Sequence, residues 1–325
     1  MPDLSHTVCN LDVRSLLAVA EARLAAPRLA TGWEPPSDDI LAQLTSASNL
    51  LVLAGPGVVR DGAIAGLHAL AVAGDLGVLN TWGAKGIFDW RSRHHLATVG
   101  LQARDAELAG VPDCDLLVRV GIDELEADPA LWGDMPTIDV PTAMLAPLAE
   151  VWSRPRTGFP TPPLRDRLAA ATQAGWAVEG APLAPSQVTR DYGAIVAAGG
   201  VVAADPGIAG FWVARTLGTT RPGAVHVPAE RDLAGFAVAC AAVAGRPSLA
   251  VVDELTDAAR ELLDLHPEVA VEVWSPDGEV LDADAHAARL EGLVAGGGIA
   301  TLAPALEHLD RFVEAAGEVT AWGGL

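Results

Sequence analysis

The stretch LLVLAGPGVVRDGAIAGLHALAVAGDLGVLNT, residues 50–81, decides the fold class of this chain. Its first apolar run, 50–55, is typical of a buried strand, and the pattern over 61–77 predicts a helix with glycine at its exit. A second apolar run, 77–81, predicts another strand. Two strands joined by a helix favour a right-handed crossover and a parallel sheet that helices cover on both faces. The stretch therefore predicts a doubly wound α/β domain.

The same alternation continues along the chain and predicts two such Rossmann-like domains. In the first half, strands are expected at 115–121 and 136–140, with a short helix at 105–110. In the second half, SPDGE at 275–279 predicts a tight turn, because Asp-Gly supplies the positive φ angles that such a turn needs. The strands expected in this half are 201–207, 224–228, 248–254, 269–274, 298–302 and 319–322.

Proline concentrates between the two halves and predicts a linker around a short helix. The expected organisation is an N-terminal segment over 1–35, with a short helix of its own, and a first domain over 36–152. The proline-rich linker covers 153–186, and the second domain covers 187–325.

Composition and charge narrow the classes of function. The formal net charge of -21 opposes binding to nucleic acid and to anionic membranes. The cysteines are odd in number and far apart, which indicates neither a disulfide framework nor a zinc site. The N-terminus lacks a signal-peptide pattern, and no apolar run reaches the roughly 20 residues that cross a bilayer. We expect a cytoplasmic protein with no nucleic-acid or membrane partner.

The turn after the first strand is a candidate phosphate site. Gly55 and Gly57 could let a phosphate approach the N-terminus of the next helix, where backbone N–H groups lack partners. The dinucleotide fingerprint G-x-G-x-x-G is incomplete, because Arg60 stands at its third glycine. The pattern leaves open whether the turn binds a nucleotide or is only a tight structural turn.

The only lysine of the chain, Lys85, lies in TWGAKG, 81–86, directly after the second strand. Ligands bind at the carboxyl ends of strands in such sheets, so Gly83 and Lys85 are candidates for meeting a phosphate or a carboxylate. A surface lysine bonded to loop carbonyls is the alternative. Schiff-base chemistry needs desolvation and a proton acceptor, and the sequence indicates neither. The nearby His94 and His95 are expected to be solvated in a polar loop.

Five runs in the first half carry a resemblance to a known family. LAGPGVVRDGA, NTWGAKGIF, TVGLQARDAELAG, DCDLLVRVGIDELEADPALW and PTIDV occur in this order between 49 and 140. Together they resemble the central domain of thiamine-diphosphate-dependent enzymes of the acetolactate synthase type. The run that holds Asp123 and Glu126 is most similar to carboligases whose central domain carries no flavin. The resemblance implies that Lys85 has a structural or ligand-proximal role rather than a catalytic one.

The resemblance continues more weakly into the second half. Residues 199–217 resemble the opening strand and helix of the family's diphosphate-binding domain, which makes Asp205 and Gly207 candidate cofactor residues. Thiamine diphosphate and magnesium are implied, but the expected Gly-Asp-Gly reads Val252-Asp253-Glu254. Asp253 is the candidate metal ligand, whereas Glu254 would place a like charge beside the diphosphate. No asparagine follows Asn80 to serve as a second ligand.

These departures predict a truncated, degenerate relative, a pseudoenzyme that is not catalytic alone. In the family that this chain resembles, the glutamate that activates the cofactor lies in an N-terminal pyrimidine-binding domain. Before residue 36 this chain has only a short segment, and the residues around its Glu21 do not match that domain. We expect no catalytic residue, no firmly bound cofactor, and a role as a partner or regulatory subunit in a homo-oligomer or with a pyrimidine-domain chain. One alternative is half of a split lyase completed by that second chain. Another is a module that binds an adenine nucleotide or coenzyme A through the turns at Gly55 and Gly83.

Overall fold

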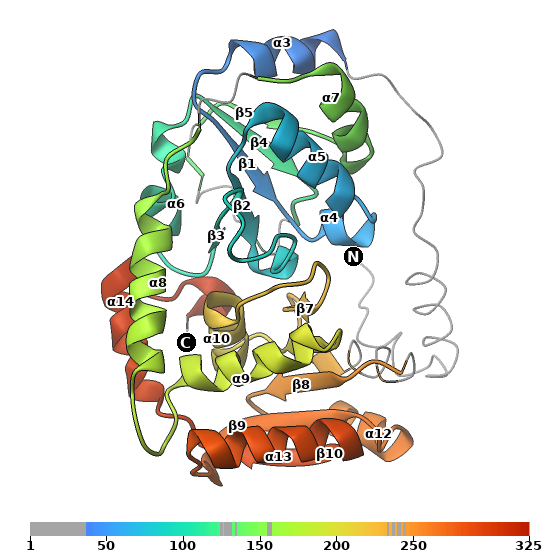
Figure 1. Ribbon diagram of the computed structural model, residues 1–325, viewed down its shortest axis with the longest axis vertical. Coiled ribbons are helices and arrows are strands. Elements are labelled where there is room, and N and C mark those ends of the chain that lie inside the picture. Colours follow the sequence, from blue (N-terminus) through green and yellow to red (C-terminus); the bar gives the residue numbers. More distant parts are fainter. Residues whose placement is uncertain are drawn as a thin grey trace.

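The computed structural model describes residues 37–123, 126, 132–133, 135–154, 158–232, 234–235, 238, 242 and 245–324. Two α/β lobes stack along the long axis of the molecule (Figure 1). Each lobe is built on a five-stranded sheet in which every pair of neighbouring strands is parallel. The predicted fold class is confirmed.

The first lobe has the strand order β3-β2-β1-β4-β5. Its central strand β1 is buried along its whole length, because neighbouring strands and the helices on both faces exclude water. The chain order reverses between β1 and β4, which makes their carboxyl ends the switch point of this sheet. The strands are β1 (Leu50–Ala54), β2 (Val78–Thr81), β3 (His95–Val99), β4 (Leu116–Val120) and β5 (Thr137–Asp139).

The helix predicted over 61–77 is α5 (Ile64–Gly74), and the one-turn helix α4 (Gly57–Arg60) precedes this range. Gly62 has a φ of +65°, outside the right-handed helical region, and it separates α4 from α5. The left-handed Asp75, with a φ of +51°, then ends α5. The helices of the first lobe are α3 (Asp38–Ser46), α4 (Gly57–Arg60), α5 (Ile64–Gly74), α6 (Asp105–Leu108) and α7 (Leu145–Val151).

The second lobe has the strand order β10-β9-β8-β6-β7, with its switch point between β6 and β8. Its strands are β6 (Val201–Ala204), β7 (Val225–His226), β8 (Ser248–Val252), β9 (Ala270–Glu279) and β10 (Gly298–Leu302). The helices that accompany them are α9 (Pro185–Ala197), α10 (Ile208–Thr216), α12 (Asp257–Leu265), α13 (Ala283–Gly296) and α14 (Leu309–Ala316).

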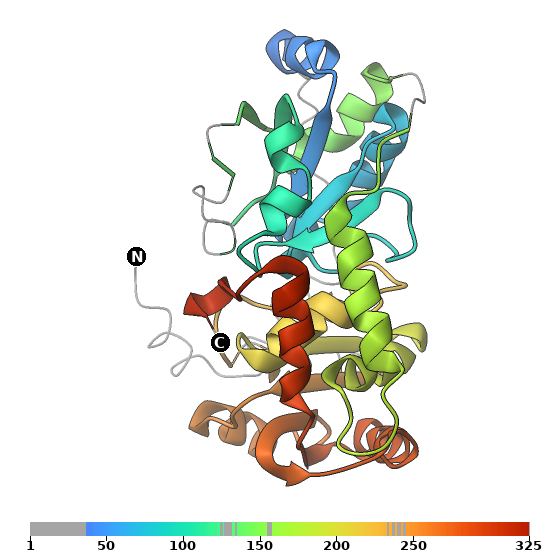
Figure 2. The same ribbon diagram turned by 90° about the vertical axis from the view of Figure 1, so that its left-hand side faces the viewer.

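The short helix expected within the predicted linker is present and packed. α8 (Pro163–Trp176) runs beside α14 along the side of both lobes (Figures 1 and 2). It contacts β3 and α6 in the first lobe and α9 in the second, and Leu164 and Leu168 are buried. The proline-rich range therefore contributes to the core, whereas a linker would be exposed.

Two local predictions in the second half are wrong. SPDGE forms no tight turn with positive φ angles: it lies within β9, where Val273 pairs with Thr301 and Glu279 pairs with the next residue, Leu302. The five residues between these two pairs bulge out of the sheet. The strand predicted at 319–322 is a single bridge from Val319 to Gln102 followed by a short 3₁₀ turn.

The two lobes share one hydrophobic core cluster, which includes Leu79 and Leu101 of the first lobe and Phe211 and Trp212 of the second. Polar contacts reinforce it, because the Gln102 side-chain amide donates to backbone carbonyls of the C-terminal segment at 2.8 and 2.6 Å. Within the described ranges, no helix has both the length and the apolar character needed to cross a membrane.

Candidate functional site

The switch point of the first sheet is closed by the backbone. The Gly55 N–H donates to the Val120 carbonyl at 2.9 Å, and the Gly57 N–H donates to the Gly121 carbonyl at 2.8 Å. A side chain at Gly57 would place its Cβ 2.7 Å from the Gly121 Cα. The N–H groups that a phosphate would need are thus occupied, and close approach of two loops explains both glycines. Cofactor binding by Gly55 and Gly57 stays a prediction.

The switch point of the second sheet is filled by a side chain. The Asp253 carboxylate, just after β8, accepts hydrogen bonds from the N–H groups of Ile208 at 2.7 Å and Ala209 at 2.8 Å. These donors are the first two residues of α10, where a helix attracts negative charge. Gly207 has a φ of +135°, and a Cβ there would collide with the same carboxylate. Asp253 therefore sits where an anion would bind.

The remaining acids near this point do not complete a magnesium-diphosphate site. Asp205 accepts from the N–H groups of Asp232 at 3.1 Å and Ala234 at 3.0 Å. Burial raises the pKa of Asp205 and Asp253 alike. Glu254 is exposed and lies 3.5 Å from Arg231. In the described part of the chain, no three His, Cys, Asp or Glu side chains are grouped to hold a metal ion. These residues do not fit the cofactor that the family resemblance implies.

The loop after β2 buries its lysine. Lys85 follows the 3₁₀ turn Trp82–Ala84 and is only 6% exposed. Burial, and to a lesser degree the positive charge of Arg215, lowers the pKa of the Lys85 amine to about 7. The amine makes no hydrogen bond within the described residues, so the surface alternative, with bonds to loop carbonyls, is wrong. The Lys85 amine is therefore desolvated, which the sequence did not indicate.

Gly83 makes room for a buried acid. One oxygen of Glu126 accepts from the Thr81 hydroxyl at 2.7 Å and from the Gly83 N–H at 3.0 Å. Burial raises the pKa of Glu126 to about 7 against the lowering effect of these hydrogen bonds. A Cβ on Gly83 would overlap the same carboxyl group. Contact with Glu126 thus explains this glycine, and its role toward a cofactor stays a prediction.

Gly83→Ala is expected to lower the free energy of unfolding by about 1–3 kcal/mol, because the methyl group must displace a buried carboxyl group. Urea denaturation measures the effect. Gly193→Ala is the control: nothing lies within 4 Å of a Cβ at this position of α9. There the added methyl should stabilise the helix by up to about 1 kcal/mol. Equal stabilisation by both substitutions would contradict the packing of Gly83 against Glu126.

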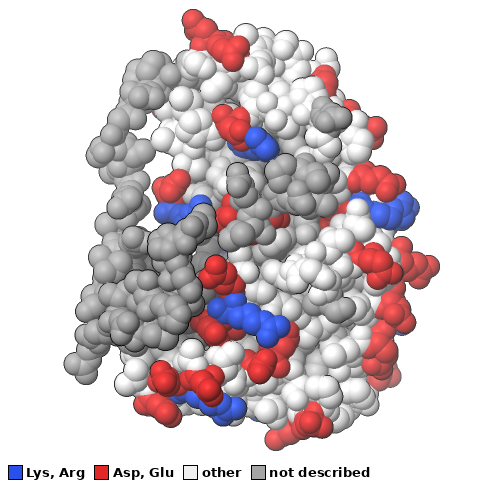
Figure 3. Space-filling model, turned by 180° about the vertical axis from the view of Figure 1, so that it is seen from behind, with Lys and Arg blue, Asp and Glu red and all other residues white. Residues whose placement is uncertain are grey.

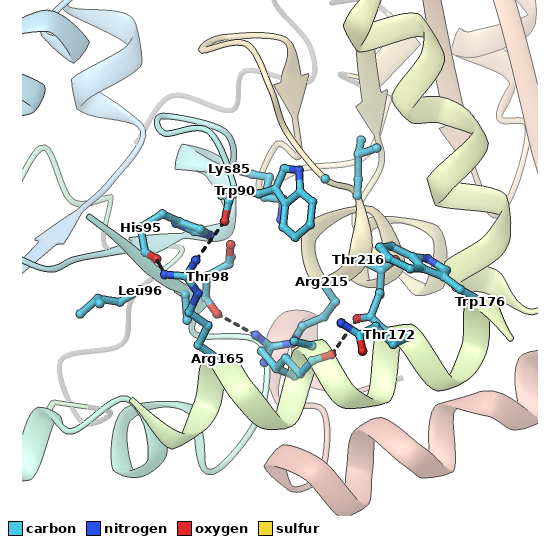
Figure 4. A pocket seen from close by; sticks show the side chains of 16 residues that line it. Lys85, Trp90, His95, Leu96, Thr98, Arg165, Thr172, Trp176, Arg215 and Thr216 are labelled. Atoms are coloured by element: carbon cyan, nitrogen blue, oxygen red, sulfur yellow. Dashed lines mark hydrogen bonds between the residues drawn. The ribbon is translucent and has the colours of Figure 1, made fainter. Parts of the chain in front are cut away.

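A cavity of about 150 Å³ lies at the junction of the lobes and collects residues far apart in sequence (Figure 4). Lys85 comes from the loop after β2 and His95 from the start of β3. Arg165 belongs to α8, and Arg215 to the last turn of α10. The other lining residues are Trp90, Leu96, Ala97, Thr98, Leu168, Ala169, Thr172, Gln173, Trp176, Thr216, Leu217 and Gly218.

The cavity is positively charged and has no acid in its lining. The Arg165 guanidinium donates only to backbone carbonyls, of which that of His95 is the closest at 2.7 Å. Arg215 forms an ion pair with Asp105, which is not among the lining residues. Burial, followed by the charges of Lys85 and Arg165, lowers the pKa of His95 to about 3. Lys85 and Arg165 thus carry positive charge that no carboxylate offsets, whereas acidic side chains spread over the surface seen in Figure 3.

The sequence marks one residue of this cavity, Lys85. The prediction that His94 and His95 are solvated is wrong: both are partly buried, and the His94 Nδ1 lies 2.7 Å from the Leu76 carbonyl oxygen. Arg165 and Arg215 were missed. A signal existed for Arg215, because it is the single charged residue in the apolar helix IAGFWVART. The other predicted residues, at the two switch points, do not line the cavity.

Comparison with known proteins relates the chain to one family. Residues 37–133 match the model of the thiamine pyrophosphate enzyme central domain. No curated protein matches the sequence. The fold is similar to a solved chain described as a "putative thiamin diphosphate-dependent enzyme" from Mycobacterium smegmatis, with a TM-score of 0.63 and 14% identity. The match covers 82% of this chain and 63% of the solved chain, less than two thirds of that chain's length.

Proposed function

We propose that this protein, whose residues 37–133 are a thiamine pyrophosphate enzyme central domain, is a non-catalytic relative of the thiamine-diphosphate enzymes that acts as a partner or regulatory subunit. One observation carries the proposal. The Asp253 carboxylate is bound to the two N–H groups at the start of α10, where an anion would otherwise bind.

Binding a diphosphate there would require this carboxylate to leave. The departure would break two charge-assisted hydrogen bonds, and the displaced carboxylate would then lie beside a second, stronger anion. A magnesium ion could offset that repulsion only if several oxygen ligands surrounded it. The Asp205 carboxylate accepts hydrogen bonds from two other N–H groups, and these contacts compete with binding of a magnesium ion. The free energy of the native contacts therefore opposes the cofactor.

A chain that holds no cofactor can contribute to the family's chemistry only through another chain. Self-association, or a complex with a pyrimidine-domain chain, is the arrangement that this role requires. The split-lyase alternative makes the opposite prediction at the second switch point, because there Asp253 would have to turn away from α10 and bind magnesium. Sedimentation of the protein alone tests self-association: a monomer at high concentration would leave only the partner complex.

Calorimetric titration with thiamine diphosphate and magnesium is expected to show no binding with a Kd below about 1 mM. This Kd corresponds to a binding free energy of about -4 kcal/mol. Asp253→Ala should not create a site, since it frees two N–H groups but also removes the one candidate metal ligand. Asp277→Ala is the matched control, because Asp277 is an exposed aspartate in the β9 bulge. Micromolar binding that disappears in Asp253→Ala and persists in the control would overturn the proposal and favour the split lyase.

A further inference from the structure

The Lys85 amine is a hydrogen-bond donor without a protein partner on the wall of a cavity. It lines the interlobe cavity, its residue is 6% exposed, and no described residue accepts a hydrogen bond from it. A buried ammonium without an acceptor is costly, and proteins commonly offset such a cost with a partner or a ligand. No carboxylate lines this cavity, so the chain itself supplies no counterion.

The other charged groups around Lys85 also favour an anion in the cavity. Arg215 faces it from α10, and Arg165 lies on α8 beside His95. Asp105 offsets the charge of Arg215, whereas Arg165 has only carbonyl partners. His95 stays neutral, because its pKa is lowered to about 3. The anion would therefore meet two positive charges without competition from an acid in the wall.

Part of the remaining wall is apolar. Leu96 and Ala97 come from β3, and Leu168 and Ala169 come from α8. Trp90 is 42% exposed and donates its backbone N–H to the Thr219 carbonyl of the other lobe at 2.8 Å. A cavity of about 150 Å³ is the size that accepts a molecule such as benzene.

We propose that the interlobe cavity binds a small organic carboxylate, with the acid group on the Lys85 amine and the apolar body against β3 and α8. The Lys85 amine offers three N–H donors and the leucine and alanine side chains of the wall offer none, so two carboxylate oxygens on an apolar body suit the site better than the four oxygens of inorganic phosphate. Both lobes contribute to the wall, so the ligand would bridge them. The site lies at the opposite end of α10 from Asp253 and is independent of the diphosphate question.

The probe is 3-methylbutanoate, which has seven non-hydrogen atoms, with 3-methylbutanamide as its uncharged isostere and inorganic phosphate as the second anion. Calorimetry at pH 6 should show that the acid binds and that the amide and phosphate bind at least tenfold more weakly. Lys85→Met should weaken binding of the acid at least tenfold, whereas Arg260→Gln, an exposed arginine on α12, should leave it unchanged. Equal binding of acid and amide, tighter binding of phosphate, or wild-type affinity in Lys85→Met would overturn the proposal.

The pH dependence gives a second readout. Affinity for the acid should fall as pH rises through about 7, the pKa of the free Lys85 amine, because the uncharged amine attracts the carboxylate less. His95 is neutral throughout this range, and the two arginines stay charged. Lys85→Met should remain folded, since it removes an uncompensated buried charge at nearly constant volume. An affinity that is flat from pH 6 to 9 in the wild-type protein would contradict the role of Lys85.

Discussion

Arg215→Met is expected to lower the free energy of unfolding by about 3–5 kcal/mol, the usual cost of breaking a buried ion pair by removing one partner. The Arg215 side chain is fully buried, and that of Asp105 is 3% exposed. One guanidinium nitrogen donates to both Asp105 oxygens, at 2.5 and 2.6 Å. Methionine would leave the Asp105 carboxylate in the interior without its counterion.

The effect should be large because this side chain helps to hold the two lobes together. Arg215 belongs to α10 of the second lobe, and all its hydrogen-bond partners lie in the first. Besides Asp105 it donates to the Gln102 side chain at 3.0 Å and to the Thr98 carbonyl at 2.7 Å. Losing it removes the donor from two further buried acceptors.

Urea denaturation of the variant measures this effect. Arg104→Gln is the control, because Arg104 forms an exposed pair with Glu107 at 2.8 Å and such pairs contribute at most about 1 kcal/mol. The double variant Arg215→Met/Asp105→Leu should recover part of the loss, since it removes both charges. A loss below about 1 kcal/mol in Arg215→Met alone would show that the pair does not hold the lobes together.

Glu272→Ala is expected to cost a similar amount, about 3–5 kcal/mol, within the second lobe alone. Glu272 is fully buried in β9 and accepts hydrogen bonds from Arg289 at 2.7 Å and from the Tyr192 hydroxyl. His286 lies 3.4 Å from it and 2.7 Å from Asp191 on its other side. Two acids and two bases thus neutralise one another inside the lobe, and alanine would leave the bases in excess.

The control for this variant lies on the same strand. Glu279→Ala removes an exposed carboxylate that is 3.4 Å from the same Arg289, so it should change stability by less than about 1 kcal/mol. Comparable losses from Glu279→Ala and Glu272→Ala in urea denaturation would contradict the buried network.

The network also predicts how stability depends on pH. Burial alone would lower the pKa of His286, but the hydrogen bonds and charges of Asp191 and Glu272 raise it to about 9. A folded pKa above the unfolded value of about 6.5 gives stability that is complete below pH 6.5 and is lost as pH rises through 9. Lys85, with its lowered pKa, has the opposite slope above pH 7. In Lys85→Met the free energy of unfolding should therefore fall more steeply as pH rises from 7 to 9, and His286→Gln should flatten this fall.

Local sequence determined the regular elements well. The apolar runs at 50–55 and 248–254 contain β1 and β8, because a parallel strand buried on both faces must be apolar throughout. The alternation of strands with helices predicted two parallel sheets, and both are present. The isolated lysine between glycines also marked its loop as unusual.

Only the tertiary structure decided what the marked residues do. The proline-rich range predicts a linker around a short helix, but only the tertiary structure shows that this helix, α8, buries Leu164 and Leu168 against other elements. Asp253 could be named as a metal ligand from its motif, but its hydrogen bonds to α10 depend on how β8 and α10 meet. The interlobe cavity draws Lys85 and Arg215 from segments about 130 residues apart in a chain of 325. Such convergence depends on how the crossovers and lobes pack, and local patterns of polarity carry no record of it.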